Sequence, residues 1–458
     1  MNKKLLHFKP TDGYLGDCFP VYVNGTYYIY YLKLKDNGSF TWALLTTDDL
    51  VNIKNDQDVL LPGSEDSLDN LLLSGCVYHD GKIFHAYYSS YGSNQRYNIM
   101  EAVSTDGLNF TKTNKILFEP NEYYEKLDTW RDPEIFYEDG IYHMLFCAKE
   151  NYLKPQIYAG CIGHATSTDL NDWTLQKPFY SPTMATTLEC PDLFKIDDKY
   201  VLGYYWHNTK FRIANKLFGK YQRNPIESPT HFDFMAVKTL QDAKRTIGLG
   251  WLPRKKCDCA PRDWGGLLAV PKELYFNEKN VLVSKFIAEV YINYPNSIKP
   301  QFEAQQGKIE KQKNKLIIDS SNHGSFYTCV GYMSYLFNSD ITVNQLNSQI
   351  TFFVKYAFDA SSNTFNGYQI IFDFSAQKLS IREQYRWDQR PDLASIAINV
   401  KENKSFSFEL IINQDVLELC IDKEQTLTFR LQKNIENTGI ALSVTDCILT
   451  LENPTIYY

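Results

Sequence analysis

Short apolar and aromatic runs alternate with polar turns along most of the chain, and the turns share a composition. Asn24-Gly25, Asp80-Gly81 and Asp139-Gly140 each follow a short apolar run and precede an aromatic-rich one, namely TYYIYYL, KIFHAYY and IYHMLF. Asn-Gly and Asp-Gly between such runs indicate a two-residue β-hairpin turn, because both central residues must accept positive φ. Asp197-Asp198 before KYVLGYYW has lost the glycine but keeps the context. The pattern predicts four hairpins.

These hairpins recur at a regular interval. Their glycine position falls at residues 25, 81, 140 and 198, so the repeat is about 58 residues long. A second marker, a Ser/Thr-x-Asp turn that closes a strand-like stretch, recurs in phase at residues 47–50, 104–107 and 167–170. A unit of about 58 residues holds four strands, which is the size of a propeller blade. Roughly 290 residues of this pattern predict an all-β, five-bladed β-propeller, with a less regular fifth blade near Asp233.

The pattern changes after residues 293–305, NYPNSIKPQFEAQ, a polar stretch with two prolines that is typical of a domain seam. Strand-like runs separated by Asn, Ser, Asp and Lys turns follow, and they predict a C-terminal β-sandwich of ~150 residues. We therefore expect a propeller over residues 1–296 and a sandwich over residues 297–458. Tyr385 and Trp387 suggest a sugar-binding patch on the sandwich, although aromatic residues that cover a sheet are the more frequent case.

Composition narrows the class of protein. The 33 tyrosines and 28 phenylalanines favour strands. The net charge is -7, and the 47 basic residues are scattered without a stripe, which makes nucleic acid an unexpected partner. No stretch approaches the roughly 18 apolar residues of a membrane span, and MNKKLL at the start lacks the apolar core of a secretory signal. We expect no membrane partner and a cytoplasmic location.

Cysteine usage agrees with that location and gives no metal site. Ten cysteines spread over 458 residues do not form a dense disulfide framework, so reduced thiols are expected. Cys257 and Cys259 form a lone C-x-C, without the second ligand pair that a structural zinc site needs. We expect neither a metal nor another cofactor.

Three of the four repeats begin their first hairpin strand with a carboxylate. Asp17 and Asp132 lie eight residues before the turn glycine and Glu189 lies nine residues before Asp198, while the second repeat has the neutral Ser74. The innermost strands of a propeller line one channel, so these side chains should converge at one mouth of it. A strand-initial Asp is often only a turn residue, but three in register favour a functional site.

Convergent carboxylates suit two kinds of chemistry. Two carboxyl groups that flank a glycosidic bond are sufficient for glycoside hydrolysis, one as proton donor and the other as nucleophile or base. A third carboxylate holds substrate hydroxyls, and Arg131 beside Asp132 would offset the repulsion among the three. The alternative is hard-metal binding, which is disfavoured because no D-x-D-x-D-G loop is present.

Six blocks, in order and spacing, make the sequence resemble glycoside hydrolase family 32, the β-fructosidases, which have a five-bladed propeller followed by a β-sandwich. The blocks are WALLTTDDLVN from Trp42, LSGCV at 73–77, RDP at 131–133, EC at 189–190, DFMA at 233–236 and WGGLLAVPKEL from Trp264. The resemblance covers essentially the whole chain.

The resemblance implies roles for the carboxylates. Asp17 would be the nucleophile and Glu189 the acid/base, while Asp132 with Arg131 would stabilise the transition state. It implies retention through a covalent fructosyl-enzyme, with the nucleophile about 5 to 5.5 Å from the acid. The expected substrates are small β-fructosides such as sucrose, fructooligosaccharides or fructose disaccharides, with hydrolysis or fructosyl transfer as the outcome.

The resemblance also implies that the sandwich is a supporting module through which the protein could self-associate. Further substrate contacts are expected from the matching blocks. The candidate contact residues are Trp42, Leu73, Ser74 and Trp264, together with His207 beside the fourth hairpin.

The stretch around Asp17, where the family has a further N-terminal block, departs from the family. YLGDCFP keeps the Asp but has Gly16 where the family offers a side-chain amide, and Leu32 stands where a Gln is common. Two other readings therefore stay open: a related five-bladed arabinosidase or xylosidase, and a non-catalytic carbohydrate-binding propeller.

Overall fold

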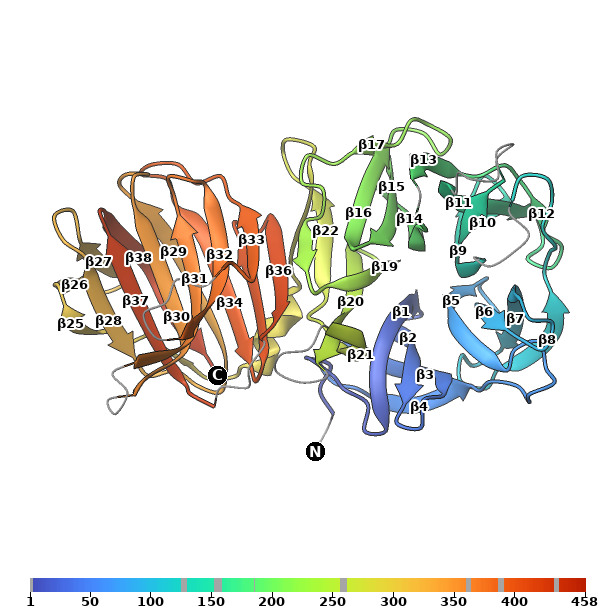
Figure 1. Cartoon of the computed structure of the whole chain (residues 1–458), viewed down its shortest axis with the longest axis horizontal. Coiled ribbons are helices and arrows are strands. Elements are labelled where there is room, and N and C mark those ends of the chain that lie inside the picture. Colours follow the sequence, from blue (N-terminus) through green and yellow to red (C-terminus); the bar gives the residue numbers. More distant parts are fainter. Residues whose placement is uncertain are drawn as a thin grey trace. The chain divides into compact units, whose positions relative to one another are not determined.

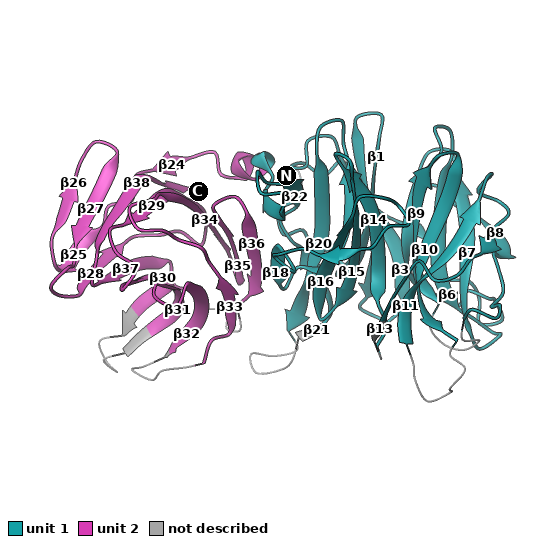
Figure 2. Cartoon of the chain, turned by 90° about the horizontal axis from the view of Figure 1, so that it is seen from above, with its two compact units in different colours: residues 1–256, 261–289 teal, residues 257–260, 290–458 magenta. Residues whose placement is uncertain are grey.

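The computed structural model describes residues 3–124, 130–151, 159–184, 186–255, 262–359, 364–385, 391–431 and 436–458. The chain divides into two compact units, with residues 1–256 and 261–289 in unit 1 and residues 257–260 and 290–458 in unit 2 (Figure 2). In the described part all regular elements are strands except for one short 3-10 helix, Ala288–Asn293, which confirms the all-β class. None of its helices has the length and apolar character needed to cross a membrane.

Antiparallel sheets build unit 1. Three follow chain order: β5 (Leu71–His79), β6 (Phe84–Tyr91), β7 (Tyr97–Ser104) and β8 (Thr111–Ile116); β9 (Arg131–Glu138), β10 (Ile141–Glu150), β11 (Ala159–Ser167) and β12 (Thr174–Leu175), with β13 (Tyr180–Met184) beside β11; and β14 (Glu189–Ile196), β15 (Lys199–Trp206), β16 (Asn208–Ala214) and β17 (Gln222–Arg223). A fourth sheet joins both ends of unit 1: β1 (Gly13–Val23), β2 (Thr26–Lys35), β3 (Phe40–Thr47) and β4 (Asn55–Leu60) with β19 (Met235–Gln241), β20 (Thr246–Lys255), β21 (Arg262–Leu268), β22 (Lys272–Phe276) and β23 (Leu282–Phe286).

Figure 1 shows β1, β5, β9, β14 and β19 around one centre, with the later strands of each sheet farther out. We call these five the inner strands. The first and last parts of unit 1 meet where Leu15 of β1 pairs with Gly266 of β21. Residues from all parts of unit 1 therefore reach the same centre.

The predicted hairpins are present, and one differs in its loop. Asn24-Gly25 and Asp139-Gly140 are two-residue turns with positive φ at both positions, and Asp197-Asp198 also joins its strands directly. In the second repeat His79 pairs with Phe84, so the loop holds four residues. The carboxylate of Asp80 accepts the backbone N–H groups two and three residues ahead, which stabilises this wider turn.

The second sequence marker is a turn that ends the third strand of each of the first three repeats. Asp49, Asp106 and Asp169 each accept N–H groups from the residues two and three ahead. Tyr30 and Tyr87, from the second strand of the preceding repeat, donate their hydroxyls to backbone carbonyls of the second and third of these turns. The marker therefore closes one sheet and ties it to its neighbour.

Each inner strand contains a one-residue β-bulge near its start. The register shifts lie between Leu15 and Cys18, Leu72 and Gly75, Arg131 and Glu134, Glu189 and Asp192, and Met235 and Lys238. A bulge re-aims side chains, and such features gather next to active sites. Two residues of the inner strand oppose one residue of its partner in each bulge. The first of these two residues has positive φ in three of the bulges, at Asp132, Cys190 and Ala236.

The bulges correct one expectation from the sequence. Counting back from the turns predicted that the three carboxylates share one position of the repeat. Instead Glu189 precedes its bulge, Asp132 is the first residue inside its bulge, and Asp17 is the second. The residues still lie at the start of inner strands, but on three successive positions, so they present their carboxyl groups differently.

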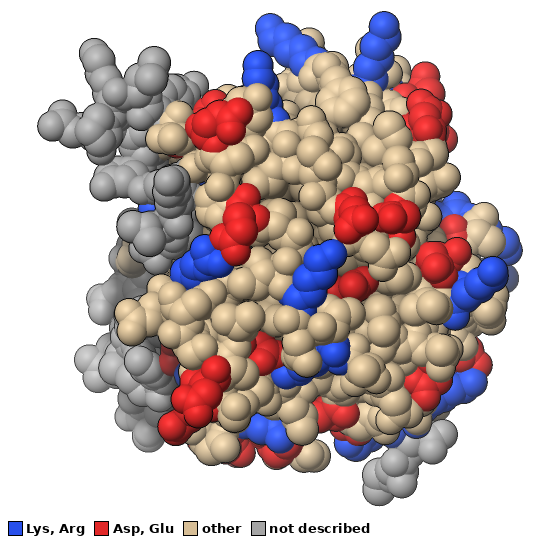
Figure 3. Space-filling model, turned by 90° about the vertical axis from the view of Figure 1, so that its right-hand side faces the viewer, with Lys and Arg blue, Asp and Glu red and all other residues tan. Residues whose placement is uncertain are grey.

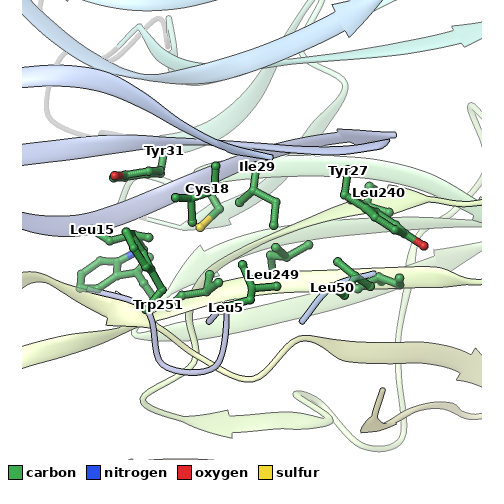
Figure 4. Close-up of a cluster of buried hydrophobic side chains, with 14 of the residues drawn as sticks. Leu5, Leu15, Cys18, Tyr27, Ile29, Tyr31, Leu50, Leu240, Leu249 and Trp251 are labelled. Atoms are coloured by element: carbon green, nitrogen blue, oxygen red, sulfur yellow. The ribbon is translucent and has the colours of Figure 1, made fainter. Parts of the chain in front are cut away.

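A buried cluster fixes β1 in place. Cys18 and Ile29 of the first hairpin pack with Leu249 and Trp251 of β20, and all four are at most 3% exposed (Figure 4). Fully burying a side chain of this size contributes roughly 1.5 to 3 kcal/mol. Leu15, also in the cluster, stands directly before the bulge. The strand that carries Asp17 is therefore anchored on both sides of that residue.

Unit 2 consists of two antiparallel sheets. One has the order β36 (Gln425–Arg430), β35 (Val416–Ile421), β34 (Phe406–Asn413), β29 (Ser334–Val343), β38 (Ile448–Tyr457), β27 (Lys315–Asp319) and β26 (Ile309–Lys311), with β24 (Ser297–Ile298) beside β38. The other has the order β25 (Glu303–Gln306), β28 (Ser325–Cys329), β37 (Gly439–Thr445), β30 (Gln349–Asp359), β31 (Thr364–Asp373), β32 (Lys378–Tyr385) and β33 (Ala394–Ala397). Phe337 and Phe408 of the first sheet contact Phe352 of the second, so the two sheets share a core.

Candidate active site

The predicted catalytic residues meet in a cavity of about 370 Å³ in unit 1. Its wall includes Asp17, Ser74, Arg131, Asp132 and Glu189, each from the start of an inner strand. A larger cavity of about 890 Å³ lies in unit 2, but among the described residues that line it Glu303 is the only carboxylate. We place the site in the smaller cavity, because acid and base chemistry needs the convergent carboxylates.

Asp17 is the most firmly held of the three carboxylates. The hydroxyl of Ser74 donates to Oδ2 at 2.5 Å, and the indole N–H of Trp251 donates to Oδ1 at 2.8 Å. Burial, with the nearby charge of Asp132, raises the pKa of Asp17 to about 6. The group is therefore mostly ionised at neutral pH, and each oxygen has a fixed donor that orients it.

Asp132 is held by backbone geometry. Its positive φ of 58° turns the strand, and its own N–H donates to the hydroxyl of Ser89 at 2.8 Å. The N–H of Cys190 donates to Oδ2 of Asp132 at 3.0 Å. The residue is 4% exposed and lines the cavity, so its remaining carboxylate oxygen is available to a group inside the cavity.

Arg131 connects the second and third carboxylates. One guanidinium nitrogen lies 2.5 Å from Oε1 of Glu189, and Nε lies 3.8 Å from Oδ2 of Asp132. The side chain of Glu189 is 39% exposed, much more than those of the two aspartates. Glu189 therefore stands where the cavity meets solvent, and the aspartates stand deeper.

Of the six predicted substrate contacts, Arg131, Leu73, Ser74 and Trp264 line the cavity. Trp42 does not: it is fully buried, its indole N–H donates to the carbonyl of Leu73, and its ring packs on Phe19. It supports the wall from behind, because β3 lies two strands outward from the centre. His207 is also outside the lining and is exposed beside Trp206.

Trp251 is a site residue that the sequence reasoning missed. It ends the apolar run of the irregular fifth repeat, and a tryptophan there reads as a core residue. Tyr205, Met235 and Phe40 also line the cavity, as does Asp263, whose carboxylate pairs with Arg254 at 2.8 Å. Only the assembled sheets bring these positions beside Asp17.

Gly16 has a physical explanation. A Cβ at this position would fall 2.2 Å from the indole ring of Trp264, so only glycine allows the ring to lie there. Trp264 in turn contacts Trp251 and Phe40. An aromatic wall therefore stands beside YLGDCFP, the stretch where the sequence departs from the family that it resembles.

The described part of the chain also bears on metal and nucleic-acid binding. Its His, Cys, Asp and Glu side chains form no group of three arranged to hold a metal ion. Cys257, Cys259 and Trp387 lie outside the described residues, as does the side chain of Tyr385. On the face shown in Figure 3, Lys and Arg are interspersed with Asp and Glu and form no continuous basic patch.

Comparisons with known proteins give a family match and individual relatives. Residues 7–285 match the model of the glycosyl hydrolases family 32 N-terminal domain. A sucrose-6-phosphate hydrolase of Bacillus subtilis is 24% identical over 286 residues, which are 55% of this chain and 57% of that protein. A raffinose invertase of Escherichia coli is 24% identical over 308 residues, 59% of this chain and 62% of that protein. The chain thus spans about three fifths of the length of these curated relatives.

Solved structures show the same fold. The sucrose-6-phosphate hydrolase of Lactobacillus gasseri superimposes with a TM-score of 0.74 at 18% identity, over 100% of this chain and 93% of that one.

Proposed function

Because this chain belongs to glycosyl hydrolases family 32, we propose that it is a retaining β-fructosidase acting on small β-fructosides. The resemblance read from the sequence blocks is thereby confirmed. The observation that carries the proposal is the meeting of Asp17, Asp132 and Glu189 in one cavity. The proposed substrates are sucrose, fructooligosaccharides or fructose disaccharides, and transfer to a second sugar is a proposed side reaction.

The proposed architecture is a five-bladed propeller over residues 1–296 followed by a β-sandwich over residues 297–458. Five inner strands around one centre support the propeller, and two sheets with a shared core support the sandwich. A cytoplasmic location and self-association through the sandwich stay predictions.

The first chemical step uses Asp17 and Glu189. The carboxylate of Asp17 attacks C2 of the fructosyl unit, while the protonated carboxyl of Glu189 donates its proton to the leaving oxygen. The C2–O bond breaks and a fructosyl ester on Asp17 forms. Positive charge develops on the sugar ring, and the buried carboxylate of Asp132 lies in the same cavity to stabilise it.

The second step releases the sugar. Glu189, now a carboxylate, takes a proton from water, the resulting nucleophile attacks C2, and the bond to Asp17 breaks. The exposure of Glu189 suits this exchange with water, whereas Asp17 is buried and held by two donors. We expect the carboxyl groups of the two residues to lie about 5 to 5.5 Å apart in the substrate complex.

The shape of the cavity favours a small substrate. Its volume of about 370 Å³ is at the low end of the usual range for ligand sites. Phe40 and Trp264 give one wall an aromatic surface, onto which the C–H face of a sugar would pack. The proposed recognition therefore relies on the charged trio with Arg131 and on ring contact.

A substrate panel tests the proposal. Wild type, Asp17→Asn and Glu189→Gln are assayed on sucrose, kestose, inulin, levan, fructose disaccharides and aryl arabinosides. Glu119→Gln, an exposed carboxylate paired with Arg96, is the control. We expect wild type and the control to hydrolyse at least one fructoside, and removal of the acid/base to cost about 10²- to 10⁴-fold.

Other outcomes identify the competing functions. A preference for arabinosides over every fructoside would favour the pentosidase. Saturable fructan binding with equal background hydrolysis by wild type and both site variants would favour a non-catalytic binding protein.

A further inference from the structure

Side chains link neighbouring inner strands of unit 1 where no backbone ladder joins their sheets. Ser74 of β5 and Trp251 of β20 both donate to Asp17 of β1. Asp132 of β9 accepts the N–H of Cys190 in β14. Two of these links, β1 with β5 and β9 with β14, thus join inner strands of different sheets through a catalytic carboxylate, whereas Trp251 lies in the same sheet as Asp17.

The junction between β14 and β19 is built differently. The ammonium group of Lys238 donates to the backbone carbonyl of Pro191 at 2.6 Å, and the N–H of Thr239 donates to Oδ2 of Asp192 at 3.0 Å. Lys238 and Asp192 are each 2% exposed. Two buried side chains, each bonded to the other strand's backbone, therefore lock these strands together.

The position of Pro191 gives this lock a functional consequence. Pro191 is the second residue of the bulge that follows Glu189, and Cys190, which binds Asp132, is the first. Proline has no N–H, so its carbonyl is the only backbone group through which hydrogen bonds can hold it. Lys238 thus anchors the bulge that aims both the acid/base and the amide on Asp132.

Charge pairing makes a buried lysine tolerable there. Its ammonium group also lies 2.6 Å from Oε2 of Glu134, the first residue after the β9 bulge. Burial and the charge of Glu134 raise the pKa of Asp192. Lys238 and Glu134 therefore compensate each other, and removing either of them would leave the other without its ion-pair partner.

We propose that Lys238 is a positioning residue, which holds the Cys190–Pro191 bulge so that Glu189 and Asp132 are aligned for reaction. The proposal rests on the fructosidase function. It predicts that loss of Lys238 impairs proton donation by Glu189 more than it impairs substrate binding.

The test compares Lys238→Met with Lys33→Met. Lys33 of β2 is also a buried lysine of unit 1. It pairs with Asp12 and Asp58, and it serves as the matched control for loss of a buried cation. We expect Lys238→Met to lower kcat on sucrose about 10²-fold, since small misplacements of a catalytic group cost this much, with KM changed only a few-fold. Lys33→Met should lose stability without this change.

The leaving group supplies a readout that general destabilisation does not move. The aryloxide group of an aryl β-fructoside can leave without a proton, so misplacing Glu189 should matter less for this substrate. We expect the kcat/KM loss of Lys238→Met to be at least about tenfold smaller on the aryl substrate than on sucrose. Equal losses on both substrates would overturn the proposal.

A second measurement separates this inference from the proposed function. Crystal structures of wild type and Lys238→Met are compared at the N–H of Cys190 and the carboxylate of Asp132. Separation of the two groups in the variant supports the positioning role, even if no fructoside is hydrolysed. An unchanged bulge would refute it, even if wild type is an active fructosidase.

Discussion

Asp17→Asn should stabilise the folded protein above pH 6, because it removes a buried charge. The pKa of Asp17 is raised from 3.8 to about 6, so the folded state binds this proton more tightly than the unfolded chain does. The free energy of unfolding therefore falls as pH rises from about 4 to about 6 in wild type. Asparagine is neutral at every pH, and its contribution stays constant.

The magnitude follows from the shift. A difference of about two pKa units at about 1.4 kcal/mol each is ~3 kcal/mol, present in full above pH 6 and absent below pH 4. Asparagine keeps an oxygen for the indole N–H of Trp251, and its amide group can donate to the hydroxyl of Ser74. The substitution thus removes the charge with little change of shape.

The assay is urea unfolding of wild type, Asp17→Asn and the exposed control Glu119→Gln at half-unit intervals from pH 4 to pH 8. We expect the midpoint of Asp17→Asn to rise above that of wild type progressively across pH 4 to 6, while the control follows wild type. A midpoint difference that does not change with pH would refute the reasoning, because it would show that Asp17 is not a strained buried charge.

Three further predictions concern the cavity. In wild type, kcat/KM should fall as pH decreases through about 6, because protonated Asp17 is not a nucleophile. Ser74→Ala should move this acidic limb of the pH profile to higher pH, because it removes a hydrogen-bond donor to the carboxylate of Asp17. An acidic limb that stays in place in the variant would exclude this hydrogen bond. Gly16→Ala should displace the ring of Trp264, raise KM and lower the folding stability by about 1 to 3 kcal/mol. Adding Trp264→Ala to this variant should recover the stability. Thermal unfolding measures the stability, and steady-state kinetics measure KM. Trp42→Phe should lower the melting temperature with KM unchanged, whereas Trp264→Ala should raise KM; a raised KM for Trp42→Phe would return Trp42 to the substrate contacts.

Local signals in the sequence predict much of the fold. Asn24-Gly25 and Asp139-Gly140 need positive φ at both residues, which few other pairs accept, so the hairpins and their period were readable. The convergence of Asp17, Asp132 and Glu189 followed from that period. The chemistry of the trio followed from residue type and from the six sequence blocks.

The remaining features depend on contacts across the chain. The bulges set the three carboxylates on different positions, and no local residue pattern announces a bulge at Asp17. Trp42 was placed in the site although it packs behind it, since an aromatic side chain suits both settings. Trp251 and Lys238 gain their roles from partners more than 45 residues away in sequence.

Trapping the covalent intermediate tests the central claim most directly. The Glu189→Gln variant is mixed with an aryl β-fructoside, whose aryloxide group can leave without a proton. The masses of the intact protein and of its peptides are then measured. The double variant Asp17→Asn/Glu189→Gln is the control. The account predicts one added hexosyl unit on the peptide that contains Asp17, and none in the double variant. An adduct on a different carboxylate, or turnover to the aryl product with no adduct and with inverted configuration, would contradict it.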